Sequence, residues 1–232
     1  MYSGKPIKDK HESGVGILMS PKAHKSLREW KPISDSIIMA RFSTKLRKLV
    51  LIQCYAPTEQ ATTDEKDAFY GTLENTLRNE KRSEITMVIV DLNAKVGADN
   101  KNFEHAMGRH GLGNMNENGE RFDELCSNNN LVIGGTLFPH KQIHKATWVS
   151  PDQTTQNQID HIAIHKKWRR SLLDVRAFRG ADAASDHQLL IGSVQLKIAA
   201  LKVRDIADTP KFNTDKLKSK MVHKNLEKEL KR

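Results

Sequence analysis

The chain has 232 residues, of which 38% are hydrophobic and 28% charged, a composition that fits one large or two small globular domains. Its longest apolar runs fall far short of the roughly 20 residues that span a bilayer, and its first residues lack the apolar segment of a secretory signal. Its two cysteines imply no disulfide framework, so we expect an intracellular protein. The formal net charge of +10 favours a polyanionic partner such as nucleic acid, although a basic surface also serves solubility.

Apolar runs and one helical repeat alternate in the first half of the chain. Phe69, Leu73 and Leu77 recur at helical spacing, and Thr62 and Glu65 just before them have the spacing of a capping box, so a helix is predicted from Thr62 onward. The last apolar run of this half, residues 85–94, is continuous enough to form a strand buried on both faces. The predicted strands are residues 14–19, 36–43, 47–57 and 85–94.

The second half begins with a polar segment rich in Gly and Asn, residues 95–119, which is predicted to be a long loop. A short helix over residues 120–129 follows, with Phe122 and Leu125 facing inward. Many short strands combined with a few helices favour an α/β fold of stacked sheets flanked by helices. The remaining predicted strands are residues 131–136, 145–150, 158–164, 172–178 and 189–198.

The last residues differ in composition from the rest. Residues 201–232 hold ten Lys or Arg against five Asp or Glu, and Leu217, Met221, Leu226 and Leu230 recur at roughly helical spacing. We therefore expect a globular domain over residues 2–200 and a basic helical tail or connector over 201–232, which docks on the domain or binds a partner.

Polar side chains collect at the ends of the apolar strands. Asp91 and Asn93 are two residues apart and so point to one face of an extended chain, while Tyr55 ends an earlier strand. Asp160 lies within a later strand, and Asp186 precedes the last one together with His187. Each residue alone has a structural explanation, as a turn cap, a rim residue or a surface acid.

Together these side chains supply what hydrolysis of a phosphoester needs. A general base activates water, amide and hydroxyl groups bind the phosphoryl oxygens, and a divalent metal neutralises the developing charge. Carboxylate oxygens suit Mg²⁺, and a histidine oriented by a carboxylate would complete the set.

Five ordered motifs carry a resemblance to a known family: "CYAPT", "VDLNAKVG", "ATWVS", "NQIDHIAI" and "SDHQLL". They resemble the signature of the endonuclease/exonuclease/phosphatase superfamily, which includes deoxyribonuclease I. The sequence between the motifs is similar to that of RTE-type non-LTR retrotransposon endonucleases and to the related craniofacial development protein 2-like sequences. The resemblance covers about residues 2–200. It implies a four-layer α/β sandwich of two packed mixed β-sheets flanked by helices, as in deoxyribonuclease I.

The resemblance also implies roles for the residues at the strand ends. Asp91 would orient or deprotonate the attacking water, Asn93 would contact the scissile phosphate, and Tyr55 would bind the phosphate or steady the metal site. Asp186 would be a ligand of Mg²⁺ or Mn²⁺.

Two further residues complete the implied site. His187, oriented by Asp160, would bind or protonate a phosphoryl oxygen, and Trp148 would pack beneath it. The implied activity is endonucleolytic hydrolysis of DNA, of the kind that apurinic/apyrimidinic endonucleases perform. The resemblance implies neither a small-molecule cofactor nor a membrane as a partner. We therefore expect DNA as the partner and the nucleus as the location.

The sequence departs from the family pattern in two places. Val90 stands where the family usually has Gly before the Asp of its Gly-Asp-x-Asn motif. The family's first strand and helix, with an Asn and a metal-binding Glu, have no counterpart, and Glu12 is the nearest acid. We therefore expect the fold without these elements, and weak or no Mg²⁺-dependent cleavage.

Two other functions stay open. A catalytically dead remnant that binds nucleic acid or protein would still bind DNA in EDTA. A phosphoesterase of the same superfamily acting on lipid phosphates would turn over phosphoinositide or sphingomyelin.

Overall fold

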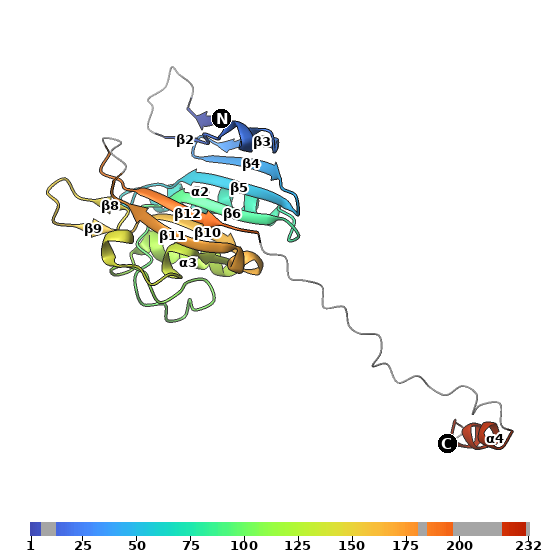
Figure 1. The fold of residues 1–232 in the computed structure, drawn as a ribbon. Coiled ribbons are helices and arrows are strands. Elements are labelled where there is room, and N and C mark those ends of the chain that lie inside the picture. The colour runs from blue at the N-terminus through green and yellow to red at the C-terminus, as the bar shows by residue number, and fades with distance from the viewer. Residues whose placement is uncertain (6–12, 181–184, 197–219, 231–232) are drawn as a thin grey trace. The chain divides into compact units, whose positions relative to one another are not determined.

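The computed structural model describes residues 1–5, 13–180, 185–196 and 220–230. The chain divides into two compact units, Met1–Lys197 and Ile198–Arg232 (Figure 1). In these described ranges, no helix is both long and apolar enough to cross a bilayer.

A six-stranded mixed sheet forms the centre of the first unit. Its strand order is β3-β4-β5-β6-β10-β7, and the β5–β6 pair is parallel whereas the other neighbours are antiparallel. The strands are β3 (Leu27–Ser34), β4 (Ile37–Ser43), β5 (Lys48–Tyr55), β6 (Ile85–Asp91), β7 (Leu131–Ile133) and β10 (Asp160–His165).

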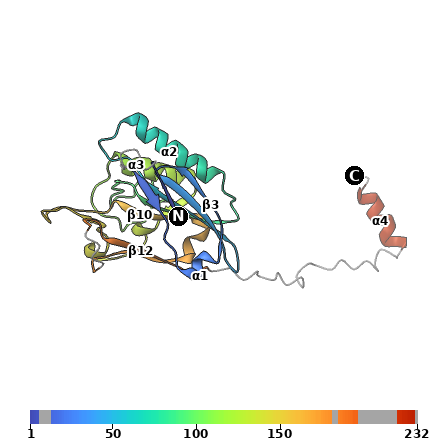
Figure 2. The ribbon, with the colours of Figure 1, turned by 90° about the horizontal axis from the view of Figure 1, so that it is seen from above.

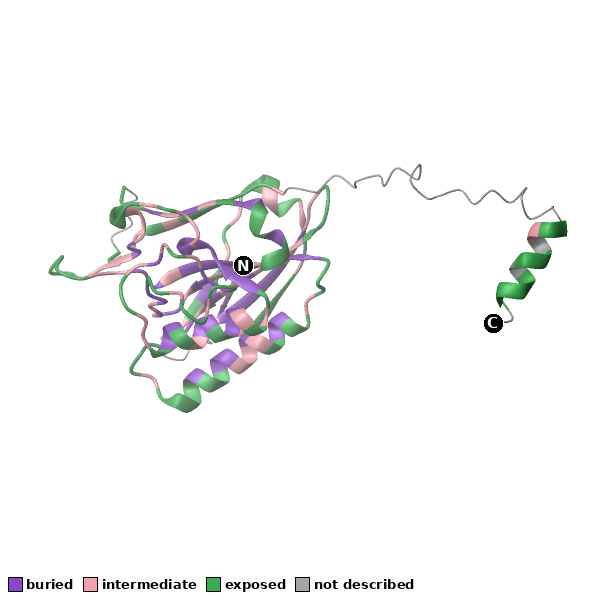
Figure 3. Cartoon of the chain, turned by 90° about the horizontal axis from the view of Figure 1, so that it is seen from below, coloured by how far each residue is buried: buried purple, intermediate pink, exposed green. Residues whose placement is uncertain are grey.

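Two helices cover one face of this sheet, α2 (Thr63–Arg78) and α3 (Glu117–Asn128) (Figure 2). The predicted capping box of Thr62 and Glu65 is present at the start of α2. The inward positions of both helices are buried as predicted, and they pack with alternate residues of β5 and β6 into one apolar cluster (Figure 3). Burial of this cluster, rather than helix propensity alone, holds the two helices on the sheet.

The opposite face carries further strands. The pair β1 (Tyr2–Gly4) and β2 (Gly14–Gly16) and the pair β11 (Leu172–Phe178) and β12 (Leu189–Val194) are each antiparallel. Gly192 of β12 packs directly on Ile162, because a Cβ at Gly192 would lie 2.8 Å from Ile162 Cδ1. The predicted α/β fold with a mixed sheet and flanking helices is confirmed. In the described residues, the strands on this face form the two-stranded sheets β1-β2 and β11-β12.

Several predicted boundaries were wrong. Strand β3 was not predicted, since its charged residues and Pro32 lack a strand pattern; it is an edge strand, where proline is tolerated. The strand predicted over residues 14–19 ends at Gly16, and Leu18 is fully exposed. Residues 145–150 contain only β8 (Trp148–Val149), which pairs with β9 (Gln156–Asn157).

Short helical segments complete the fold: α1 (Pro21–His24), η1 (Gly134–Thr136), η2 (Gln142–His144) and η3 (Lys166–Ser171).

The second unit contains the helix α4 (Lys220–Leu230), which confirms the predicted C-terminal helix. Met221 and Leu230 on this helix are exposed. Leu217 of the same predicted pattern, and Glu12 near the N-terminus, lie outside the described residues.

Candidate active site

Three predicted site residues lie side by side on adjacent strands. Tyr55 is the register partner of Asp91 in the β5–β6 pair, and Asp91 is the register partner of Asp160 in the β6–β10 pair. Neighbouring strands are about 4.8 Å apart, and register partners project to the same face of a sheet. A phenol and two carboxylates therefore form one row, here called the polar row, which faces away from α2 and α3.

His187 joins this row from a separate segment. A β-bridge between Trp148 and His187 brings it to the sheet, where its Nδ1 lies 3.0 Å from Asp160 Oδ2. Its Nε2 lies 3.9 Å from Asp91 Oδ2. One potential ligand atom from each of Asp91, Asp160 and His187 falls within 4.8 Å of the others, so these three residues could hold a metal ion.

Burial and neighbouring charged groups shift the pKa values of Asp91 and His187. Burial, and then the negative charge of Asp160, raise the pKa of Asp91 from 3.8 to about 6. The hydrogen bond to Asp160 raises the pKa of His187 above its ordinary value, because the carboxylate stabilises the imidazolium form. Asp91 is therefore a carboxylate that can exchange a proton near pH 6, beside a histidine whose protonated form Asp160 stabilises.

A buried threonine, Thr147, hydrogen-bonds both to the start of β10 and to the segment that carries His187. The Oγ1 atom of Thr147 accepts hydrogen bonds from the backbone N–H groups of Ile159 and Asp160, both at 3.0 Å. Its carbonyl accepts the N–H of Gln188, next to His187, at 2.7 Å. Sequence reasoning missed this residue, although it precedes Trp148 in the motif "ATWVS".

Asp186 does not belong to the cluster that contains the other two predicted acids, Asp91 and Asp160. Its exposed carboxylate accepts a 2.7 Å hydrogen bond from the indole N–H of Trp148, and it is outside the three-residue cluster. Its role as a metal ligand stays a prediction, as does the packing role of Trp148. The Trp148 side chain lines a pocket of about 370 Å³ together with Asn93, Asn157 and His187.

Asn93 follows the end of β6 in a left-handed backbone conformation, with φ of 49°, which Asn adopts more readily than most residues. Its N–H donates to Asp91 Oδ1 at 3.2 Å, and its carbonyl accepts from the side-chain amide of Asn116 at 3.1 Å. Asn118, which is fully buried, donates to the carbonyls of Pro57 and Leu92. Asn116 and Asn118 thus anchor the strand ends. Asn116 is the N-cap of α3, a signal that the sequence carries, whereas no such signal marks Asn118.

Val90 does not crowd the polar row. It is buried in the cluster beneath α2 and α3, on the face of the sheet opposite to Asp91. A branched residue is therefore compatible with this site.

The fold is shared with solved nucleases, whereas no protein-family model matches the chain. The endonuclease domain of TRAS1, a telomere-specific non-LTR retrotransposon, aligns with a TM-score of 0.54 and 12% identity over 74% of this chain and 70% of that one. The 3′-5′ exonuclease of Neisseria meningitidis aligns with a TM-score of 0.53 and 15% identity over 73% and 72%. A Neisseria 3′ phosphatase bound to a product DNA hairpin aligns with a TM-score of 0.52 and 14% identity over 70% and 66%. The chain thus has the fold of the endonuclease/exonuclease/phosphatase proteins.

Sequence comparison adds a narrower relationship. Craniofacial development protein 2 of Bos taurus is 35% identical over 219 residues, which are 94% of this chain and 37% of that protein. Its counterpart in Tragulus javanicus is 36% identical over 186 residues, 80% of this chain and 32% of that protein. The chain is a homologue of craniofacial development protein 2 and spans about a third of the length of these relatives.

Proposed function

We propose that the chain hydrolyses phosphodiester bonds of DNA as an endonuclease that depends on a divalent ion, Mg²⁺ or Mn²⁺. The observation that carries the proposal is the meeting of the polar row with His187, since a phenol, two carboxylates and an imidazole converge there from four separate segments. This set of groups matches the requirements of phosphoester hydrolysis.

The donor set fits a divalent ion. Carboxylate oxygens are the preferred ligands of Mg²⁺, and two carboxylates with an imidazole lie within 4.8 Å here. Asp91 and Asp160 would hold the ion, with Asp186 as the predicted further ligand. When bound, such an ion would neutralise charge on the phosphoryl oxygens.

The protein's own groups would carry the proton transfers. Asp91 would accept a hydrogen bond from the attacking water and orient it toward phosphorus. His187, held by its 3.0 Å contact with Asp160, would donate to a phosphoryl oxygen. Tyr55 and Asn93 would donate hydrogen bonds to the same phosphate and fix its position.

DNA is the proposed substrate, and hence the nucleus the proposed location. The formal charge of +10 suits a polyanion, and solved neighbours named for DNA-processing activities share the fold. A lipid phosphate would also be acidic, so it serves as the alternative substrate in the test.

The test is nicking of supercoiled plasmid by the purified chain with Mg²⁺ or Mn²⁺. Because the family's metal-binding Glu has no counterpart, we expect weak nicking, which EDTA abolishes and which Asp91→Asn and His187→Ala each reduce by about a hundredfold or more. Glu104→Gln, at an exposed acid outside the site, is the matched control and should retain full activity. DNA binding in EDTA without any nicking would identify a non-enzymatic protein, and turnover of phosphoinositide without nicking would identify a lipid phosphoesterase.

A further inference from the structure

The end of the six-stranded sheet opposite to the polar row is built from four segments. They are the approach to β3, the β4–β5 turn, the approach to β6, and η3, which follows β10. The register places them together, because β4 ends where β3 and β5 begin, and β10 ends where β6 begins. We call this surface the basic end; its segments are residues 20–28, 43–48, 79–84 and 165–171.

The basic end carries a large excess of positive charge. It holds twelve Lys or Arg against two acids, Glu80 and Glu84, and both acids bind the guanidinium of Arg41, at 2.5 and 3.2 Å. All twelve basic residues are exposed, and none forms an ion pair with the part of the chain that the structure describes. They are Lys22, Lys25, Arg28, Lys45, Arg47, Lys48, Lys81, Arg82, Lys166, Lys167, Arg169 and Arg170. Uncompensated charge of one sign attracts a polyanion.

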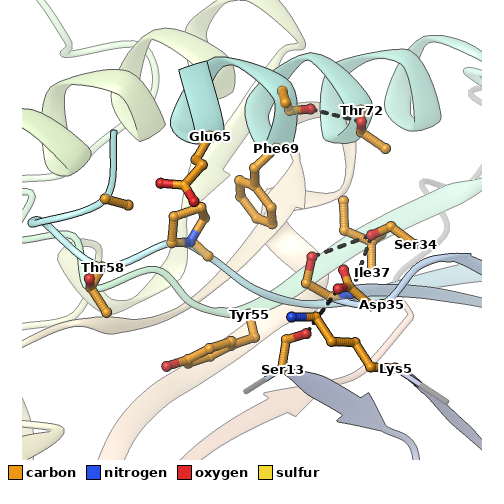
Figure 4. A pocket seen from close by; sticks show the side chains of 15 residues that line it. Lys5, Ser13, Ser34, Asp35, Ile37, Tyr55, Thr58, Glu65, Phe69 and Thr72 are labelled. Carbon is orange, nitrogen blue, oxygen red and sulfur yellow. Dashed lines mark hydrogen bonds between the residues drawn. The ribbon is translucent and has the colours of Figure 1, made fainter. Parts of the chain in front are cut away.

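The end of the sheet that holds the polar row has the opposite charge. The segments that surround this row contain seven Asp or Glu and one Lys. Figure 4 shows two of the acids, Asp35 and Glu65, on the lining of the hollow beside Tyr55, together with Lys5. The positive charge that favours a polyanion therefore lies at the far end of the sheet from the candidate active site. The segments counted are residues 34–37, 55–65, 91–95, 156–160 and 185–188.

The dimensions of the basic end suit an extended ligand. From β3 to β10 there are four strand spacings of about 4.8 Å, so the basic segments form a row about 19 Å long. The phosphates of one strand of a duplex recur every 3.4 Å or so along its axis, so such a row faces roughly five or six of them. The two ends of the sheet are separate surfaces, because the eight residues of β5 extend over about 23 Å.

We infer that the basic end binds the phosphate backbone of duplex nucleic acid, at a surface separate from the candidate active site. The binding would be independent of base sequence, because contacts from Lys and Arg to phosphates carry no sequence information. The inference extends the proposed function without depending on cleavage. The basic end would supply affinity that the acidic surroundings of the polar row do not, and would hold the chain on nucleic acid while another stretch reaches that row.

A membrane surface fits the basic end less well. Proteins that lie on a bilayer insert several apolar side chains beside their basic ones. In the four segments of the basic end, Leu46 is the one large apolar residue that is exposed, and Trp168 of η3 is buried. The chemistry of the surface is thus almost purely that of phosphate binding.

The test measures binding of a fluorescein-labelled DNA duplex by fluorescence anisotropy, in EDTA and over a series of KCl concentrations. Each phosphate contact contributes about 0.9 to the slope of the logarithm of the affinity against the logarithm of the salt concentration. Loss of contacts therefore lowers both the affinity and the slope. Residues 201–232 are also basic, but they are present in every protein compared and so do not affect the difference.

Two variants with the same loss of charge locate the binding surface. The first changes one lysine in each segment of the basic end, and the second changes four exposed basic residues elsewhere. The basic-end variant combines Lys25→Gln, Lys45→Gln, Lys81→Gln and Lys166→Gln. The control variant combines Lys31→Gln, Lys101→Gln, Arg109→Gln and Lys141→Gln.

We expect the basic-end variant to bind the duplex about tenfold more weakly or worse, with a slope smaller by about two to four, and the control variant to change the slope by less than about one. Equal effects of the two variants would overturn the inference, because net charge alone would then explain the binding. Vesicles of phosphatidylcholine and phosphatidylserine provide the second ligand. Loss of vesicle binding in the basic-end variant, with DNA binding intact, would also overturn it and would identify a membrane surface.

The two proposals fail in different ways. A chain that nicks plasmid, but whose two variants bind DNA equally, contradicts the basic end alone. A chain that does not nick, yet loses DNA affinity in the basic-end variant and not in the control variant, contradicts the catalytic proposal alone.

Discussion

His187 Nδ1 lies 3.0 Å from Asp160 Oδ2, although the two residues are 27 positions apart in the chain. The contact fixes the imidazole, leaves its Nε2 directed toward Asp91, and favours the protonated ring. Much of the chemistry proposed for the site depends on this pair.

Replacing Asp160 with Asn should lower the pKa of His187. The hydrogen bond from His187 to the Asp160 carboxylate is the largest cause of the raised pKa, and an amide carries no charge to sustain it. Imidazole resonances followed by NMR during a pH titration of the metal-free protein measure the change. Asp174→Asn, which removes the carboxylate that pairs with His140 instead, is the control and should leave His187 unaltered. An unchanged titration of His187 in Asp160→Asn would contradict the assigned pairing.

Replacing Thr147 with Val should destabilise the protein, because the backbone N–H groups of Ile159 and Asp160 would lose their shared acceptor. An unsatisfied buried donor costs about 1–3 kcal/mol, so we expect the free energy of unfolding in urea to fall by at least that amount. Thr147→Ser keeps the oxygen and should stay close to the unmodified chain. A loss of stability in Thr147→Ser with none in Thr147→Val would mean that the methyl group, not the hydroxyl, holds this segment.

Replacing Val90 with Gly, the residue usual in the family, should cost stability without improving catalysis. The side chain of Val90 is buried against the helices, so the loss of its apolar surface and the added chain freedom should cost about 2–4 kcal/mol. Urea unfolding and plasmid nicking measure the two effects, with Val90→Ala as an intermediate. Increased nicking by Val90→Gly would instead show that Val90 crowds the site.

Replacing Asp123 with Asn should stabilise the protein more at pH 8 than at pH 5. Asp123 is fully buried, its carboxylate oxygens have no hydrogen-bond partner among the described residues, and burial raises its pKa from 3.8 to about 8. The unfolded chain releases this proton above about pH 4 whereas the folded chain retains it to about pH 8, so stability falls between these values. The slope is at most about 1.4 kcal/mol per pH unit, and the Asp123→Asn variant would lack it.

Urea midpoints of the two proteins at pH 5 and pH 8 measure the difference. Asp99→Asn, at an exposed aspartate, is the control and should show no such dependence on pH. A constant difference between Asp123→Asn and the unmodified chain would argue against a protonated Asp123.

The strand ends that carry Tyr55, Asp91 and Asp160 could be located from sequence, because each follows or begins an apolar run. Their order across the sheet could not, since β10 inserts between β6 and β7 through long-range pairing. Thr147, Asn116 and Asn118 escaped prediction for a related reason. They lie in polar segments that look exposed, and their burial or anchoring role arises only when distant segments meet.

The register between β6 and β10 determines both which side chains are buried in the interior and which lie in the polar row. Asp160 pairs with Asp91, while the next residue, His161, is buried and bonds to the carbonyl of Ala94. A slip of one residue would turn Asp160 into the apolar cluster and push an interior position outward. A one-residue pairing error that inactivates the site would thus also disrupt the interior, so quality control that recognises misfolding would remove such inactive register isomers as well.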